Sequence, residues 1–312
     1  LMEADGTVPR YGADDGADLF PLSNASYEDF RPTVGTALAL FVGERLAPGP
    51  WDEAALALLG PVPLTAVRLP EVSVDHRAAG VAVLRHPRGT LFFRAPTVFR
   101  HRPSHADQLH VSLRWDGRWL AEDPGTFSYR ASQDDDPSFA GARFHNVVMV
   151  GGREPMRRAS RFLWLPWRAC RRYPAGQAAA LDGDRGERWA RAVLRVSAGF
   201  VIVDRVTGAA AGEPITLRWH GRSRALLEAL TIACSSASTE AWVTADPTTG
   251  EGWHASRYGR REPAWVRRLT AAGPTVFFVT ALGPRVRLES GDLLIDDLRH
   301  PLSADPGQAP CS

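Results

Sequence analysis

Five side chains able to bind a metal or transfer a proton lie close together in one stretch of the sequence, FRHRPSHADQLHVSLRWDGRWLAEDPGTFSY, residues 99–129. They are His101, His105, Asp107, His110 and Asp123. Imidazole and carboxylate groups can ligate a metal ion, exchange protons with a substrate, or brace neighbouring strands as a hydrogen-bonded pair. Choosing among these chemistries requires knowing which elements position the five residues.

A β-hairpin is the element that this stretch predicts. Asp116-Gly117 favours a two-residue type I′ turn, because both residues tolerate positive φ angles. A loop of that length pairs Trp115 with Arg118, and regular counting outward then places His110 opposite Asp123. Alternation assigns the two faces of the first strand: Leu109, Val111, Leu113 and Trp115 on the apolar face, and His110, Ser112 and Arg114 on the polar face.

The rest of the chain predicts two kinds of structure. Residues 33–46 and 51–60 have helical spacing of apolar residues, and Pro and Gly residues delimit them. Beyond residue 61, short runs rich in Val, Leu, Phe and Trp follow one another with no helical pattern of comparable length between them. This order predicts a mainly β chain, a large antiparallel β-sandwich after a short helical segment. Phosphate-binding glycine loops and a GxSxG nucleophile elbow are absent from the sequence.

Composition excludes several classes of protein. All 37 cationic residues of the 312 are Arg, but they are scattered among 35 acidic residues and the net charge is only +2, which disfavours a nucleic-acid partner. No apolar stretch approaches the roughly 20 residues that span a bilayer, so no membrane span is expected, and no signal peptide is visible. Three widely spaced cysteines, Cys170, Cys234 and Cys311, form no disulfide framework or zinc-finger pattern.

The motifs around the hairpin resemble a known family. HADQLHVSLRWDGRWLAEDPGTFSY, followed by ARFHNVVMVGG, is similar to the C-terminal domain of the heparinase II/III-like polysaccharide lyases, in which His-Ala-Asp, Asp-Pro-Gly-Thr and His-Asn occur in this order. The similarity covers roughly residues 70–170. The segment YGADDGADLFPLSNASYEDFRP resembles the last turns of the α/α toroid that precedes this domain. The resemblance implies that residues 1–65 are a toroid remnant and residues 66–312 a β-sandwich.

The resemblance also implies one structural zinc ion. The family's ligands correspond here to His105, Asp123 and His145, and two imidazoles, a carboxylate and a water suit Zn²⁺. The residues alone leave a second interpretation open, a hydrogen-bonded His–Asp pair on a sheet. The regular register favours His110 over His105 as the neighbour of Asp123, and His110 is then a candidate for a supporting contact to the site.

A lyase of this family cleaves uronate-containing chains by β-elimination, which requires a neutralised carboxylate, a base and an acid. The family places a histidine two residues before the HAD histidine and a catalytic tyrosine on the toroid, but the first position is Pro103 here. His101 is the remaining candidate for the base and Arg102 for neutralising the carboxylate; an exposed loop histidine and a solvated surface arginine are the alternatives. The candidate substrate-binding residues are Arg100, Asn146, Tyr27 and Tyr129, although Asn146 and Tyr27 would also serve as a turn cap and a packed ring.

The resemblance makes an acidic polysaccharide the expected partner and the periplasm or the exterior of a bacterium the expected location. The chain by itself is expected to be a poor catalyst, since the toroid tyrosine is not found in it. Two rival functions stay open. One is a non-catalytic carbohydrate-binding or scaffold domain, which Pro103 favours. The other is a glycoside hydrolase using Asp107 and Asp123 as its two carboxylates.

Overall fold

The computed structural model describes residues 1–17, 22–61, 63–68, 71–100, 105–129, 139–173 and 177–302. The chain forms two compact units. Unit 1 contains residues 1–9 and 16–72, and unit 2 contains residues 10–15 and 73–312. The sequence predicted a division between residues 65 and 66. The mainly β, antiparallel fold predicted from the sequence is confirmed.

Unit 1 is small and helical. Its elements are α1 (Arg31–Phe41), β1 (Glu44–Arg45), the 3₁₀ turn Pro50–Asp52, α2 (Glu53–Leu59) and β2 (Thr65–Ala66), with β1 and β2 pairing in parallel. Pro32 stands in the first turn of α1, where its missing N–H costs no helical hydrogen bond. The helix ends at Phe41, earlier than the predicted residue 46, because Gly43 adopts a φ of +74° that an α-helix cannot continue.

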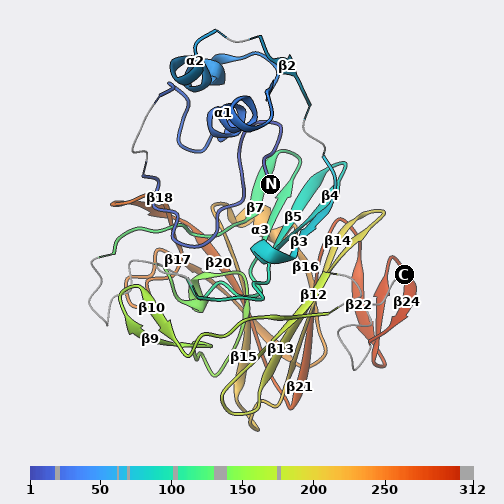
Figure 1. Cartoon of the computed structure of the whole chain (residues 1–312). Helices are drawn as coiled ribbons and strands as arrows, with labels where there is room; N and C mark the ends of the chain where they lie inside the picture. The colour runs from blue at the N-terminus through green and yellow to red at the C-terminus, as the bar shows by residue number, and fades with distance from the viewer. Residues whose placement is uncertain are drawn as a thin grey trace. The chain divides into compact units, whose positions relative to one another are not determined.

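Unit 2 contains three larger antiparallel sheets (Figure 1). The six-stranded sheet has the order β11 (Arg171–Arg172), β12 (Gln177–Asp182), β13 (Arg188–Val196), β14 (Gly199–Thr207), β21 (Thr275–Leu282), β16 (Thr231–Cys234). The five-stranded sheet has the order β3 (Val74–His76), β4 (Val81–His86), β5 (Gly89–Arg94), β6 (Val111–Trp115), β7 (Arg118–Ala121). The four-stranded sheet has the order β17 (Ser238–Thr244), β20 (Trp265–Ala272), β15 (Pro214–Gly221), β8 (Val148–Val150).

Smaller elements complete unit 2. They are the hairpins β9 (Arg157–Ser160)–β10 (Leu163–Leu165) and β18 (Trp253–Arg257)–β19 (Arg260–Pro263), the sheet β22 (Val286–Glu289)–β23 (Asp292–Ile295)–β24 (Leu298–Pro301), the helix α3 (Arg224–Glu228) and two 3₁₀ turns, Arg77–Ala79 and Ala142–Phe144.

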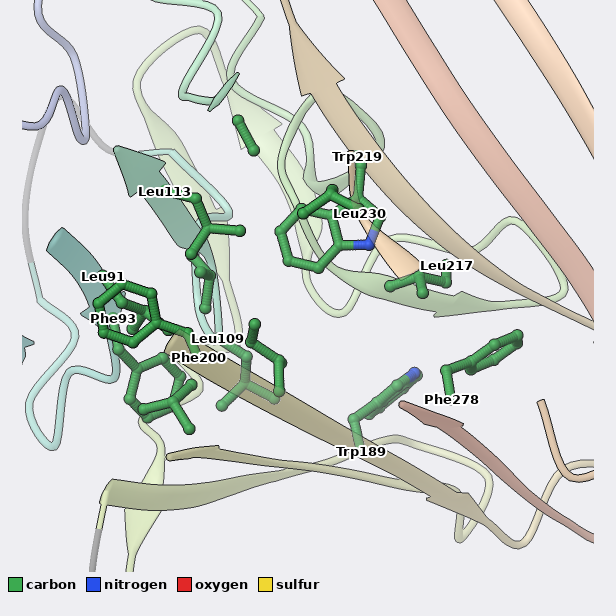
Figure 2. Close-up of a cluster of buried hydrophobic side chains, with 14 of the residues drawn as sticks. Leu91, Phe93, Leu109, Leu113, Trp189, Phe200, Leu217, Trp219, Leu230 and Phe278 are labelled. Atoms are coloured by element: carbon green, nitrogen blue, oxygen red, sulfur yellow. The ribbon is translucent and has the colours of Figure 1, made fainter. Parts of the chain in front are cut away.

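The main core combines side chains from all three larger sheets (Figure 2). Trp189, Phe200 and Phe278 come from the six-stranded sheet, and they pack in one cluster with Leu91, Phe93 and Leu113 of the five-stranded sheet and with Leu217 and Trp219 of the four-stranded sheet. The two smaller sheets meet where the Glu122 amide donates to the His220 carbonyl (3.0 Å). All three sheets therefore share one buried core, in the antiparallel β-structure that the succession of short apolar runs predicted.

The predicted turn of the β6–β7 hairpin is confirmed, but its register is not. Trp115 pairs with Arg118, and Asp116 and Gly117 both have positive φ, as the Asp-Gly pair predicted. A β-bulge then shifts the ladder, so that Leu113 pairs with Ala121. The prediction that His110 pairs with Asp123 is therefore wrong, since an extra residue in one strand moves every later pair by one. Both residues lie beyond the ends of the paired strands.

Candidate metal centre

Three segments far apart in the sequence bring His105, Asp123 and His145 together in unit 2. His105 lies between β5 and β6, Asp123 follows β7, and His145 follows the 3₁₀ turn Ala142–Phe144. One potential ligand atom from each side chain lies within 4.8 Å of the other two. All three residues are buried, and Asp123 and His145 have no exposed surface. The closest pair is Asp123 Oδ2 and His145 Nδ1, 3.1 Å apart.

Neighbouring residues fix the direction of each candidate ligand. The Gly125 amide donates to Asp123 Oδ1 (2.8 Å), which leaves Oδ2 on the side of His145. Thr126 Oγ1 lies 3.3 Å from His105 Nε2. Both contacts come from the Asp-Pro-Gly-Thr motif, so this motif supplies a ligand and also residues that orient two ligands. Such supporting contacts are typical of metal sites, where they restrict rotation of the ligand side chains.

His110 lies beside the centre but is already committed to other partners. Its ring centroid is 5.5 Å from that of His145, in an edge-to-face arrangement. Nδ1 accepts the Asn146 amide hydrogen (3.1 Å), so Nε2 carries the proton and donates to Ser112 Oγ (2.9 Å). Burial lowers the pKa of His110 to about 3, which keeps the ring neutral. His110 therefore has no lone pair left for a metal and acts as a support for the His145–Asn146 segment.

Electrostatics favour a cation at the centre. Burial, the largest single influence, would raise the pKa of Asp123, but the imidazoles of His145, His110 and His105 together hold the pKa well below the usual range. Conversely, burial acts to lower the pKa of His145, but the carboxylates of Asp123, Asp107 and Glu154 together raise it. In the part of the chain that the structure describes, neither nitrogen of His145 has a well-oriented hydrogen-bond partner. A buried carboxylate facing such a ring is stable when a proton or a metal ion balances its charge.

These residues fit Zn²⁺. Two imidazoles and one carboxylate are a ligand set that zinc accepts, with a further position for water. The unsatisfied nitrogens of His145 are the specific observation, since a well-packed structural histidine normally has both nitrogens hydrogen-bonded. Without a metal ion, His145 and Asp123 would instead be the His–Asp pair that the sequence left open as an alternative. Measuring the metal content of the purified protein distinguishes the zinc site from this pair.

The other predicted site residues have different surroundings. His101 and Arg102 lie outside the described residues, as does Pro103. Arg100 is exposed. Asn146 is fully buried: its Nδ2 donates to the Val111 carbonyl (2.8 Å) and its Oδ1 accepts the His220 amide (2.6 Å). The Asn146 amide therefore joins β6 to β15 and has no exposed surface, which is a link between distant strands and not a cap within one turn.

The two predicted tyrosines lie in different units. Tyr129 is half-buried in unit 2, and its hydroxyl donates to Asp15 Oδ2 (3.0 Å). Burial and this bond raise the pKa of Tyr129, so the hydroxyl is a poor proton donor to a substrate. Tyr27 belongs to unit 1, where its ring contacts Phe30 edge to face, with centroids 6.2 Å apart.

Asp107 and Asp123, the two carboxylates of the glycoside hydrolase alternative, are both buried. Asp107 is 2% exposed and its Oδ2 lies 3.4 Å from Arg94 Nε, and Asp123 has no exposed surface. A glycosidase needs both carboxyl groups in contact with substrate or water. The structure therefore gives no support to a two-carboxylate hydrolase at this position.

Two further histidines near the centre were not singled out from the sequence. His220 and His254 are buried, and burial lowers the pKa of His220 well below its usual value and that of His254 to about 3. Nearby cations act in the same direction. The signal for His220 was its place on the polar side of the strand ITLRWHG. His254 has no local signal, because tertiary contacts alone bring its strand to the Asp123 segment.

The fold and the buried cluster define a β-sandwich domain that encloses a His–Asp–His centre. The chain belongs to the heparinase II/III-like C-terminal family, whose model matches residues 69–284. This membership relates it to polysaccharide lyases of the heparinase type. None of the curated proteins compared with the chain matches its sequence significantly.

Solved structures show the same fold. A heparinase III structure with methylated lysines superposes with a TM-score of 0.63 at 15% identity, over 96% of this chain and 49% of that one. The heparan sulfate lyase HepC from Pedobacter heparinus gives a TM-score of 0.62 at 13% identity, over 97% of this chain and 51% of that one. This chain therefore spans about half the length of these structures. Among the described residues, no helix is long and apolar enough to cross a membrane.

We predict that Gly125→Ala destabilises the protein more than Gly117→Ala does. Both glycines have a φ of +77°, so both substitutions incur the same backbone strain. A Cβ at Gly125 would lie 2.3 Å from the Ala255 carbonyl oxygen, whereas a Cβ at Gly117 meets nothing within 4 Å. Urea unfolding should show a cost of about 1 kcal/mol for Gly117→Ala and clearly more, about 3 kcal/mol, for Gly125→Ala. Equal costs would mean that the Asp123 loop adjusts freely.

We also predict that stability falls on acidification below about pH 6.5. The pKa values of His110 and His254 are lowered to about 3 and that of His220 is lowered too, so the unfolded chain binds more protons between these values and 6.5. Stability therefore rises with pH across that window. His145, with its raised pKa, acts in the opposite direction: its contribution is present below pH 6.5 and is lost at higher pH.

Substituting one of the three histidines tests this pH dependence. His254→Gln should reduce the slope of unfolding free energy against pH by up to about 1.4 kcal/mol per pH unit between pH 4 and 6. His76→Gln, at an exposed position, is the control for the substitution itself. Urea unfolding at a series of pH values measures both, and an unchanged slope in His254→Gln would show that His254 is already protonated in the folded protein.

Proposed function

We propose that this chain contains the β-domain of a polysaccharide lyase-type protein that acts on an acidic, uronate-containing polysaccharide by β-elimination, and that one zinc ion held by His105, Asp123 and His145 stabilises this domain. The observation that carries the proposal is this buried cluster in a chain of the heparinase II/III-like C-terminal family. The solved relatives support the fold, and HepC is described as a heparan sulfate lyase.

The zinc ion would have a structural role. When bound, it would balance the charge of Asp123 and link three segments that lie far apart in the sequence. The complete burial of two ligands keeps polysaccharide away from the ion, so the protein groups that touch substrate lie elsewhere on the domain. His101 as the base and Arg102 as the group that neutralises the carboxylate remain proposals for this reaction.

A second candidate is a non-catalytic carbohydrate-binding domain. Pro103 favours it, because proline cannot transfer a proton at the position where the family pattern has histidine. Both candidates involve an acidic polysaccharide and, by the family, a periplasmic or secreted location. The two candidates differ in whether the protein cleaves the polysaccharide after binding it.

Assays for unsaturated uronate ends distinguish these candidates. This chain and its complete gene product would each be incubated with heparan sulfate, hyaluronan and alginate, and ultraviolet absorbance of the product followed. We expect turnover from the complete product and little from the chain alone, because one missing acid–base group lowers the rate roughly 10²–10⁴-fold. Binding of these glycans with no turnover by the complete product would establish the carbohydrate-binding alternative. Neither binding nor turnover would refute both.

A further inference from the structure

The β18–β19 hairpin presents an exposed group of arginine and tyrosine side chains. Its tip has the sequence Arg257-Tyr258-Gly259-Arg260, followed by Arg261, and all five residues are exposed. The hairpin carries three arginines and one glutamate, a net charge of +2. Arg260 pairs with Glu262 (3.0 Å). Among the described residues, no carboxylate forms an ion pair with Arg257 or Arg261, so these charges remain available to a partner.

The hairpin is anchored to the segment that begins with Asp123. The Ala255 amide donates to the Pro124 carbonyl and the Gly259 amide to the Phe127 carbonyl, both at 2.7 Å. Arg10 also holds strand β18, because its guanidinium donates hydrogen bonds to the carbonyls of Ala255 and Ser256. The backbone of the tip is therefore held in place before any partner binds, which lowers the entropic cost of binding.

Aromatic rings lie beside the arginines. Tyr258 is 44% exposed and its ring is 5.4 Å from that of Tyr129, which in turn contacts Phe162 edge to face at 5.2 Å. The Arg261 guanidinium lies over the rings of Phe127 and Trp253, at 4.8 and 4.4 Å from their centroids. An exposed ring can stack on the C–H face of a sugar, and guanidinium groups beside the ring can bind the anionic groups of the same sugar chain.

We propose that this hairpin tip is a binding surface for an acidic polysaccharide, with Arg257, Arg260 and Arg261 contacting carboxylate or sulfate groups and Tyr258 stacking on a sugar ring. This inference rests on the proposed function and adds a location to it. A polysaccharide fits better than nucleic acid, because the whole chain carries a net charge of only +2 and the surface combines few cations with an exposed ring.

The charge component is tested with a double variant and a matched control. Arg257→Gln/Arg260→Gln should weaken binding of heparan sulfate and hyaluronan roughly tenfold at 0.1 M salt, about threefold for each exposed arginine, and should reduce the salt dependence. The control, Arg287→Gln/Arg299→Gln, makes the same charge change at two exposed arginines of the separate β22–β23–β24 sheet and should leave binding within twofold. Isothermal titration calorimetry and salt elution measure both, with neutral dextran as a ligand that should not bind.

The stacking component has its own pair of variants. Tyr258→Ala should weaken binding several-fold, whereas Tyr258→Phe keeps the ring and should bind like the parent protein. Circular dichroism and melting temperature establish that each variant folds. Equal losses in the hairpin and control arginine pairs, or unchanged binding in Tyr258→Ala, would overturn the proposal.

The choice of ligands separates this inference from the proposed function. If the parent protein binds acidic glycans and the hairpin variants bind them equally well, the surface lies elsewhere and only this inference fails. If the parent protein binds no acidic glycan, both this inference and the proposed function fail. Equal or tighter binding of double-stranded DNA or anionic phospholipid vesicles would overturn the assignment of the surface to polysaccharide.

Discussion

His145→Ala is expected to abolish zinc binding and to lower the melting temperature by about 10 °C. The substitution removes one of the three candidate ligands and takes away the imidazole that lies closest to the buried Asp123 carboxylate. Breaking a buried charged pair costs roughly 3–5 kcal/mol, and each kcal/mol lowers the melting temperature by about 2–4 °C in a domain of this size. Elemental analysis should find about one zinc per chain in the parent protein and none in the variant.

Chelation and two further variants complete this test. Removing zinc from the parent protein should lower its melting temperature, while the same treatment should leave His145→Ala unaffected, since binding to the folded state alone stabilises it. Asp123→Asn keeps the shape of the side chain and should also lose the metal, and exposed His76→Ala should keep it. If His145→Ala retains both its zinc and its melting temperature, the three residues are not a metal site.

Arg191→Met is expected to be the most destabilising single substitution in the six-stranded sheet that leaves the three candidate ligands intact. Arg191 has no exposed surface and forms two hydrogen bonds to Asp204, Nε–Oδ1 at 2.7 Å and Nη2–Oδ2 at 2.9 Å. Burial already raises the pKa of Asp204 despite this partner. Removing the arginine leaves a buried carboxylate alone, at a cost of roughly 3–5 kcal/mol.

Arg191 also connects this sheet to the candidate metal centre. Its Nη1 donates to the carbonyls of Leu109 (2.7 Å) and Asn146 (2.5 Å), which precede His110 and follow His145 in the sequence. Leu109 has a φ of +67°, an unfavourable conformation for leucine that this bond helps to maintain. Arg191→Met should therefore weaken zinc binding roughly 10–100-fold, as loss of supporting contacts does elsewhere.

Urea unfolding of three variants, Arg191→Met among them, separates the contributions of Arg191. Arg191→Met/Asp204→Leu should recover part of the stability, because no buried charge remains, but not the part due to the two carbonyl bonds. Arg188→Met, in the same strand, removes the exposed pair with Asp182 and should cost less than about 1 kcal/mol. A similar cost for Arg188→Met and Arg191→Met would show that the buried pair contributes little.

The sequence determined the features that depend on neighbouring residues. Asp116-Gly117 predicted its turn correctly, since positive φ is a property of these two residues alone. The succession of short apolar runs without helical patterns between them predicted an antiparallel β fold, and the ordered HAD, DPGT and HN motifs identified the family. The zinc ion and the roles of His101 and Arg102 stay predictions.

The tertiary structure decided what depends on contacts between distant segments. The bulge between Leu113 and Arg114 changed the register and so removed His110 from the position opposite Asp123. Three contacts link segments that are separated by 22 to 82 positions in the sequence. They are the contact of Asp123 with His145, the hydrogen bond of buried Asn146 to Val111, and the hydrogen bond of Arg191 to Leu109. Local preferences act over a few residues, whereas packing of one sheet on another selects these contacts, so only the folded chain shows which polar side chains share a buried site.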